Sequence, residues 1–241
     1  MPTERELAEN NIINWNLIEH RYTNPDLLLG NGFSLQFSGN FSYTSLFDIF
    51  LQNCDEFHSR LFREFDTTNF ELIQKYLTYA LKVNGILGLS TNEITIAIEQ
   101  LKNGLIQTIE QVHPRNQDIN FEQLENIALQ MSAFGNIFTT NYDLYLYHII
   151  MKSMDLRLKQ KGYIPYQDYF WGNQAPNGFK QFMSYQNYNY KDIFYLHGSL
   201  FIFRENLMDI KLLRDREETE LIDIISEQIR NNKFPTFISE G

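Results

Sequence analysis

The chain has 241 residues, of which 43% are hydrophobic and 21% charged, and 20 Lys and Arg against 30 Asp and Glu give a net charge of −10. This balance excludes disordered and low-complexity classes, and the length suits one large domain whose core needs no disulfide or metal. The acidic charge argues against a binder of nucleic acid duplexes. The single cysteine, Cys54, cannot form an internal disulfide or a cysteine-rich zinc site.

The N-terminal sequence carries charges and no apolar stretch of the kind found in signal peptides. No run of about 18 apolar residues is present, so a membrane helix is not expected. We therefore expect a soluble, cytoplasmic protein with neither a membrane nor a nucleic acid as its partner.

Aromatic residues are unusually frequent, with 20 Phe, 14 Tyr and 2 Trp making 15% of the chain. Such residues pack cores and half-bury their hydroxyl groups, which is one interpretation of their number. Stacking on a nucleobase or a nucleotide ring is the other.

The first half of the chain predicts one short strand and several helices. A turn at 24–26 precedes the apolar run 27–29, which we expect to be a buried strand that ends in the glycine-rich turn 30–34. Apolar residues then recur at three- and four-residue steps, which predicts helices over residues 45–54, 69–83, 91–112 and 120–133.

The second half predicts further strands, each followed by polar residues. A strand over 136–140 ends at Asn141-Tyr142-Asp143 and leads into a helix that reaches about Met154. Residues 162–191 show little periodicity and are expected to form an ordered loop. The remaining expected elements are a strand over 192–196 ending at His197-Gly198, extended chain over 199–203, a helix over 215–231 and a strand over 234–238.

Strands separated by helices predict an α/β fold, a Rossmann-like parallel sheet with helices on both faces and a helical insert subdomain. We expect one domain over 1–241, with a core of about 24–54 and 134–241, an insert of about 55–133, and a C-terminus that is incomplete. The polar clusters 30–34, 139–143 and 197–198 each follow a strand. Because ligands of such folds bind beyond the carboxyl ends of the strands, the three clusters should meet in one crevice.

Each cluster has a chemical and a structural interpretation. Gly30 and Gly32 suit a close approach of the backbone to a phosphate, but a plain turn explains them equally well, and Leu35 replaces the third glycine of G-x-G-x-x-G. Asn141 or Asp143 could cap the next helix instead of serving a ligand. His197 is the one histidine at an expected strand end beside a glycine, where a general base could face a cleft.

Taken together, the three clusters resemble the Sir2 (sirtuin) family and its bacterial SIR2-like relatives. Residues 30–34, Gly-Asn-Gly-Phe-Ser, are similar to the sirtuin Gly-Ala-Gly-x-Ser turn, with Asn31 in place of Ala. Residues 139–143, Thr-Thr-Asn-Tyr-Asp, resemble Thr-Gln-Asn-x-Asp and match a form common in defence-associated members. Leu196-His197-Gly198 is similar to the sirtuin His-Gly element. The sequence of residues 27–34, Leu-Leu-Leu-Gly-Asn-Gly-Phe-Ser, also resembles the DUF4917 subgroup.

The resemblance implies a site at which NAD⁺ is the substrate and its nicotinamide–ribose bond is cleaved through an oxocarbenium-like state. It implies that His197 is a general base, that Asn141 positions the ribose and an attacking water, and that Asp143 holds the nicotinamide or the ribose. Ser34 would bond a phosphate or ribose oxygen. The implied contacts to NAD⁺ come from Gly30, Asn31, Gly32, Phe33, Ser34, Thr140, Asn141, Asp143 and Gly198.

Two departures from the sirtuins change the expected activity. The zinc module of the deacylases needs two Cys-x-x-Cys pairs, and this chain has only Cys54, so no zinc or other metal is expected. Residues 35–48 also lack the arginine that follows the sirtuin glycine turn. SIR2-like defence proteins lack the module too, and many hydrolyse NAD⁺ during phage infection.

These observations lead us to expect an NAD⁺ hydrolase that releases nicotinamide and ADP-ribose, as a bacterial antiphage-defence effector. The alternatives are a non-catalytic module that binds NAD⁺ or ADP-ribose and regulates a partner, and a sirtuin-like ADP-ribosyl transferase or deacylase. A homo-oligomer or a regulatory partner protein is the expected means of control.

Overall fold

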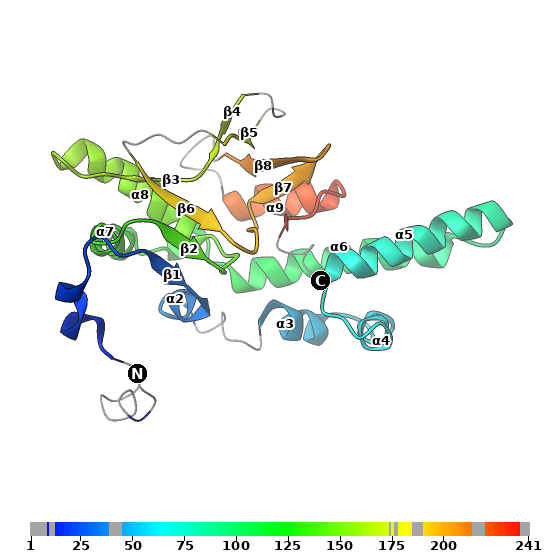
Figure 1. The fold of residues 1–241 in the computed structure, drawn as a ribbon. Helices are drawn as coiled ribbons and strands as arrows, with labels where there is room; N and C mark the ends of the chain where they lie inside the picture. The colour runs from blue at the N-terminus through cyan, green and yellow to red at the C-terminus, as the bar shows by residue number, and fades with distance from the viewer. Residues whose placement is uncertain are drawn as a thin grey trace.

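The computed structural model describes residues 9, 13–38, 45–173, 175, 178–184, 190–213 and 220–236. Its centre is a parallel sheet in the strand order β1-β2-β6-β3 (Figure 1). Every neighbouring pair in this sheet runs parallel. The expected α/β class and the parallel sheet are therefore confirmed. The strands are β1 (Leu27–Leu29), β2 (Ile137–Thr139), β3 (Tyr166–Gln167) and β6 (Lys191–Tyr195).

The two faces of this sheet differ in burial. Leu29, Ile137 and Ile193 belong to the buried core, together with the apolar residues of the helix that follows β2. On the other face, Leu28, Phe138 and Phe194 form one row in register, and the rings of Phe138 and Phe194 stack with centroids 4.9 Å apart. Leu28 is 65% exposed, so this face is less covered than the first.

Helices form where the apolar periodicity predicts them, with ends that differ by a few residues. Asn69 and Asn120 begin two of them by accepting hydrogen bonds from the N–H groups of Leu72 and Gln123. A further helix over 56–64 lies inside the expected insert. The helices are α2 (Asn31–Leu35), α3 (Ser45–Asn53), α4 (Glu56–Glu64), α5 (Phe70–Leu87), α6 (Asn92–Val112), α7 (Phe121–Met131), α8 (Tyr145–Lys159) and α9 (Leu221–Arg230).

The helix α3, which the sequence groups with the core, packs against α6 of the insert. A Cβ atom on Gly104 would lie 2.8 Å from a ring carbon of Phe50, so only glycine allows this close approach. Phe50 also meets Phe62 and Phe70 edge to face, with centroids 5.5 and 4.8 Å apart. This cluster shows that part of the aromatic content serves core packing.

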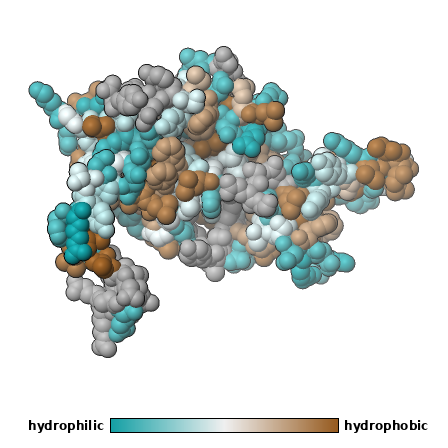
Figure 2. Space-filling model, viewed as in Figure 1, coloured by the Kyte–Doolittle hydropathy of each residue, from teal (hydrophilic) through white to brown (hydrophobic). Residues whose placement is uncertain are grey.

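The helices α5 and α6 form a hairpin that projects away from the sheet (Figure 1). Ile86, Leu87 and Leu89 at its free end are 84%, 64% and 57% exposed. Figure 2 shows the hydrophobic side chains gathered at this end.

A second, antiparallel sheet was not expected. Its order is β4-β5-β8-β7, and its strands are β4 (Phe170–Gly172), β5 (Phe179–Phe182), β7 (Ile202–Glu205) and β8 (Met208–Leu212). The prediction of a loop over 162–191 is therefore wrong, because β3, β4 and β5 lie in it. These strands have two to four residues, too few to show an alternation, and β3 and β5 also pair with β6 and β8, which lie farther along the chain.

Three other predictions need correction or lie partly outside the described residues. The glycine-rich segment is not a turn, because the helix α2 begins at Asn31 directly after Gly30. The expected strand over 234–238 is reduced to a single bridge between Pro235 and Phe203, and residues 237 and 238 lie outside the described part. The helix expected from 215 begins at Leu221, with residues 215–219 outside the described part.

Within the described residues, no helix is both long and apolar enough to cross a membrane.

Candidate functional site

The three sequence clusters lie at the carboxyl ends of three adjacent strands. β1, β2 and β6 end at Leu29, Thr139 and Tyr195, which are paired in register across the sheet. The backbone continues the pairing one step further, because Thr140 N donates to Leu29 O at 3.1 Å and Leu196 N donates to Thr139 O at 2.8 Å. The topology thus brings Gly30, Asn141 and His197 to one edge of the sheet, as the sequence predicts.

Asn141 connects the first two clusters directly. Its side-chain nitrogen Nδ2 donates to the Gly30 carbonyl oxygen at 3.0 Å and to Ser34 Oγ at 2.8 Å. These two bonds use both amide hydrogens and fix the orientation of the side chain. The carbonyl oxygen Oδ1 has no hydrogen-bond partner among the residues that the structure describes, so it can accept one from a ligand.

Ser34 and Asp143 differ from the roles that the resemblance implies. Ser34 is only 1% exposed, and its hydroxyl donates to Asp143 Oδ2. Asp143 is 4% exposed, and its other oxygen Oδ1 accepts from Tyr145 N at 2.8 Å, at the start of α8. A buried hydroxyl and a buried carboxylate need partners inside the protein. Both residues bond within the protein, and Asp143 bonds to the start of α8 as the capping interpretation predicts, while the ligand contacts that the resemblance implies for them stay predictions.

Burial raises the pKa of the Asp143 carboxyl above its usual value, although the bonds from Ser34 and Tyr145 act in the opposite direction. The Asn141 side chain is held by hydrogen bonds that run from Asn141 through Ser34 to Asp143. Such a network keeps Asn141 in one position only while every member stays satisfied.

The backbone at the two glycines, Gly30 and Gly32, is exposed beside Asn141. Gly30 and Gly32 are exposed, and a Cβ atom added to either would meet no atom of the described residues within 4 Å. Neither has the positive φ angle that would require glycine for the turn itself. Packing against the described residues and backbone conformation therefore do not require glycine at either position.

The other expected contacts on α2 are partly buried. Asn31 and Phe33 are both half-buried, and the Phe33 ring meets Phe37 edge to face at 5.5 Å. Phe37 in turn stacks on Tyr145 with centroids 4.1 Å apart. Through these rings α2 is anchored to α8, whose first residue also bonds to Asp143.

His197 lies at the end of β6 and is exposed. Gly198 follows with a φ angle of 68°, a left-handed conformation that favours glycine and turns the chain sharply after the histidine. Thr140 is half-buried, and its hydroxyl donates to Leu29 O at 3.4 Å. His197 is thus exposed to solvent at the end of β6.

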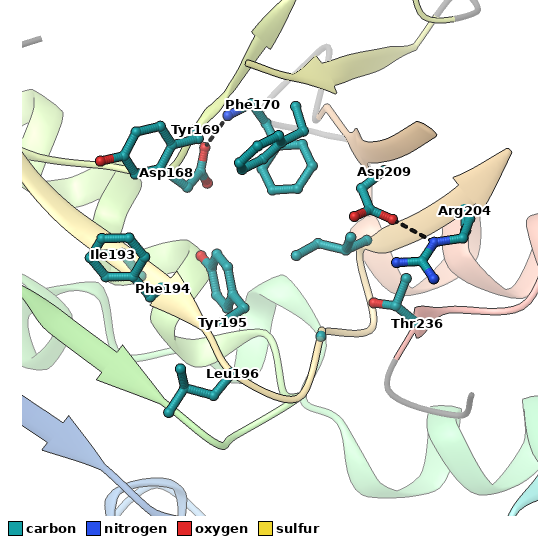
Figure 3. A pocket seen from close by; sticks show the side chains of 13 residues that line it. Asp168, Tyr169, Phe170, Ile193, Phe194, Tyr195, Leu196, Arg204, Asp209 and Thr236 are labelled. Carbon is teal, nitrogen blue, oxygen red and sulfur yellow. Dashed lines mark hydrogen bonds and ion pairs between the residues drawn. The ribbon is translucent and has the colours of Figure 1, made fainter. Parts of the chain in front are cut away.

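One feature that the sequence did not reveal is a cavity of about 530 Å³ beside this site (Figure 3). It lies between β6 and the antiparallel sheet. Leu196 and Gly198, the two neighbours of His197, are among its lining residues. Its residues come from segments that lie up to 68 positions apart, from Asp168 to Thr236, and only the Tyr and Phe richness of 162–195 hinted at it.

Among the described residues, no three His, Cys, Asp or Glu side chains come together in a way that could hold a metal ion. The expected absence of zinc remains a prediction.

Comparison with known proteins gives the family of the chain but no activity. A search of curated proteins finds no match. The family DUF4917, described as a domain of unknown function, matches residues 27–241, which includes all three clusters at the strand ends and both sheets. The chain belongs to the DUF4917 family.

Proposed function

We propose that the strand ends form the active site of an NAD⁺ hydrolase. In this reaction the bond between the nicotinamide nitrogen and the ribose C1′ breaks, and the bonding electrons leave with nicotinamide. A water oxygen bonds to C1′, its proton passes to a base, and the second product is ADP-ribose. The SIR2-like resemblance of the three clusters suggested this reaction.

The observation that carries the proposal is the double hydrogen bond from Asn141 to Gly30 O and Ser34 Oγ. It joins two motifs that lie more than 100 residues apart and leaves one amide oxygen as an acceptor at the strand ends. A ribose hydroxyl or a water molecule is a donor that fits this acceptor. Preorganised polar groups of this kind need no rearrangement when charge develops on the ribose.

Each residue then has one role. The open backbone at Gly30 and Gly32 accommodates the pyrophosphate, and Asn141 Oδ1 orients a ribose hydroxyl or the water. His197 accepts the proton as general base. Ser34 and Asp143 are positioning residues, because they are buried and act through Asn141.

Purified protein incubated with NAD⁺ tests the proposal, with nicotinamide and ADP-ribose followed by chromatography. We expect equal amounts of both products from the unchanged protein, and almost none from His197→Ala or Asn141→Ala. His20→Ala is the matched control, since His20 is also exposed but lies in the short helix 19–21 before β1. Normal turnover by both site variants would overturn the assignment of the site.

A non-catalytic NAD⁺-binding module is the second candidate, and one observation favours it. Ser34 and Asp143, which a catalytic site would use on the ribose, bond to each other. Calorimetry separates the two functions, because saturable NAD⁺ binding without nicotinamide release supports the module and excludes the hydrolase under those conditions.

The resemblance also supports a role in bacterial antiviral defence in the cytoplasm. Cells that carry the chain should then lose NAD⁺ after phage infection, and cells with His197→Ala should keep it. Unchanged NAD⁺ levels in infected cells of both kinds would contradict this role.

A further inference from the structure

The cavity beside β6 is enclosed by aromatic side chains from both sheets. Tyr169 lies over Phe194 of β6 with ring centroids 5.7 Å apart, and Phe170 meets Phe182 at 5.7 Å. Figure 3 shows Tyr169, Phe170 and Phe194 around the cavity. At about 530 Å³, the space lies in the range of small-molecule sites. Walls of this kind suit a flat ring, because aromatic faces stack on one another.

The charged residues of the cavity are paired. Asp168 is buried and bonds to Lys211 Nζ at 2.5 Å. Arg204 and Asp209, whose side chains are exposed, form a second pair at 2.8 Å, which Figure 3 shows as a dashed line. Among the described residues each lining carboxylate is matched by a cation, so this part of the chain offers no surplus positive charge to a phosphate. The cavity favours a neutral ligand.

Tyr195 leaves a polar group unsatisfied in the wall. Its hydroxyl oxygen is buried and has no hydrogen-bond partner among the described residues. In Figure 3 the hydroxyl lies on the side of the ring toward Asp168. Burial raises the pKa of Tyr195 well above its usual value, so the group is a neutral donor and acceptor. A buried polar group without a partner is costly, and a ligand that supplies one relieves the cost.

The backbone of β6 adds a second set of polar groups. β3 pairs only with Lys191 and Asp192, so in the described structure no strand lies beside Ile193–Tyr195 on that edge. The cavity runs along this unpaired part, since Ile193, Phe194 and Tyr195 line it. An edge of this kind bears N–H and C=O groups that can bond to the rim of a base.

We propose that the cavity between β6 and the antiparallel sheet is a binding site for a neutral nucleoside. The base stacks between the aromatic walls and bonds to the Tyr195 hydroxyl and the β6 edge. The ribose hydroxyls lie toward Asp209 and Thr236, both of which line the cavity. This site is separate from the strand ends at Gly30 and Asn141, and it does not depend on NAD⁺ cleavage.

Calorimetric titration of the full chain with adenosine, guanosine, cytidine and uridine, each alone, tests the proposal. At least one should bind in a saturable way, and its 5′-monophosphate should bind more weakly. Tyr195→Phe should weaken binding about three- to tenfold through the lost hydrogen bond. Phe182 is an exposed member of the aromatic wall, and Phe182→Ala should weaken nucleoside binding about tenfold or more.

Two matched controls fix the location. Tyr79→Phe makes the same chemical change on the exposed surface of α5 and should bind like the unchanged protein. Asn141→Ala should also keep its nucleoside affinity, and a loss there would move the nucleoside to the strand ends and overturn the proposal. Thermal unfolding without ligand checks the fold, and Tyr195→Phe should be no less stable because it removes an unsatisfied hydroxyl.

The proposal fails if none of the four nucleosides saturates the protein. It also fails if binding is unaffected by both Tyr195→Phe and Phe182→Ala, or if the monophosphate binds more tightly than its nucleoside. Each of these results is independent of whether the protein cleaves NAD⁺.

Discussion

The strand β6 separates two regions of opposite character. On the side of β1 and β2, the strand ends carry a hydrogen-bonded polar network, and the exposed backbone of Gly30 and Gly32 lies open to solvent. On the other side, the cavity is walled by aromatic rings, and its charges are matched in pairs. On our proposals the first region orients reacting groups, whereas the second encloses a ring. This difference predicts that the same kind of substitution has different consequences in each.

The largest expected effect belongs to His197. His197→Ala should lower the rate of NAD⁺ cleavage by about 10²- to 10⁴-fold, because a general base contributes that much. The free energy of unfolding should change little, because the side chain is exposed. Steady-state rates and urea denaturation of one preparation measure both quantities. Strong destabilisation without loss of rate would mean that the strand-end region is structural.

In the cavity region, removal of a charge should act on stability instead. Lys211→Ala leaves the Asp168 carboxylate buried without its partner, which should cost about 3–5 kcal/mol of unfolding free energy. Lys159→Ala is the control, since its bond to Glu125 is exposed and worth at most about 1 kcal/mol. Urea denaturation measures both. Equal losses would show that the Asp168–Lys211 pair is not a buried pair in solution.

His113 should make the stability of the protein depend on pH. It lies near the strand-end region, and its ring centroid is 6.5 Å from that of Tyr142. Burial lowers its pKa from 6.5 to about 4, although the bond to Ile109 O acts in the opposite direction. The unfolded chain therefore binds the proton first, and stability should fall by about 3 kcal/mol as the pH drops from 6.5 to 4.

This loss should be absent or much smaller in His113→Leu, whose side chain cannot bind a proton. Urea denaturation at several pH values gives the slope for both proteins. The same slope in both would assign the acid sensitivity to other groups.

The smallest expected effect on stability belongs to the glycines. Gly30→Ala should change the unfolding free energy by less than about 0.5 kcal/mol, because the added Cβ meets none of the described residues within 4 Å. NAD⁺ affinity should nevertheless fall about tenfold if the substrate approaches this backbone. Gly88→Ala is the opposite case, because Gly88 has a φ angle of 70° at the end of α5. This substitution should lower the unfolding free energy by about 1 kcal/mol and leave the NAD⁺ affinity unchanged.

The sequence predicts the strand-end region better than the cavity for a physical reason. The apolar runs before Gly30, Asn141 and His197 are strands, and parallel topology alone then brings their ends together. The long helices α5 and α6 were predictable in the same way, from a periodicity maintained over five turns or more.

Contacts between side chains were not predictable in this way. Ser34 meets Asp143 across 109 positions, and no local pattern shows that the two bond to each other rather than to a ligand. The cavity depends on β4, β5, β7 and β8, whose pairing brings Phe170 and Asp168 near Arg204 and Asp209. β4 and β5, like β7 and β8, are neighbours in the chain, but strands of three to five residues give little signal of their own, so their sheet was missed.

Two separate segments of the chain form the antiparallel sheet. β4 and β5 are made first, the chain returns to the parallel sheet to form β6, and it then leaves again to form β7 and β8. Because β6 lies between β2 and β3, deletion of the segment 170–212 would also remove an interior strand of the parallel sheet. The antiparallel sheet therefore cannot be deleted as one continuous segment, and the two sheets must be expressed and engineered as one unit.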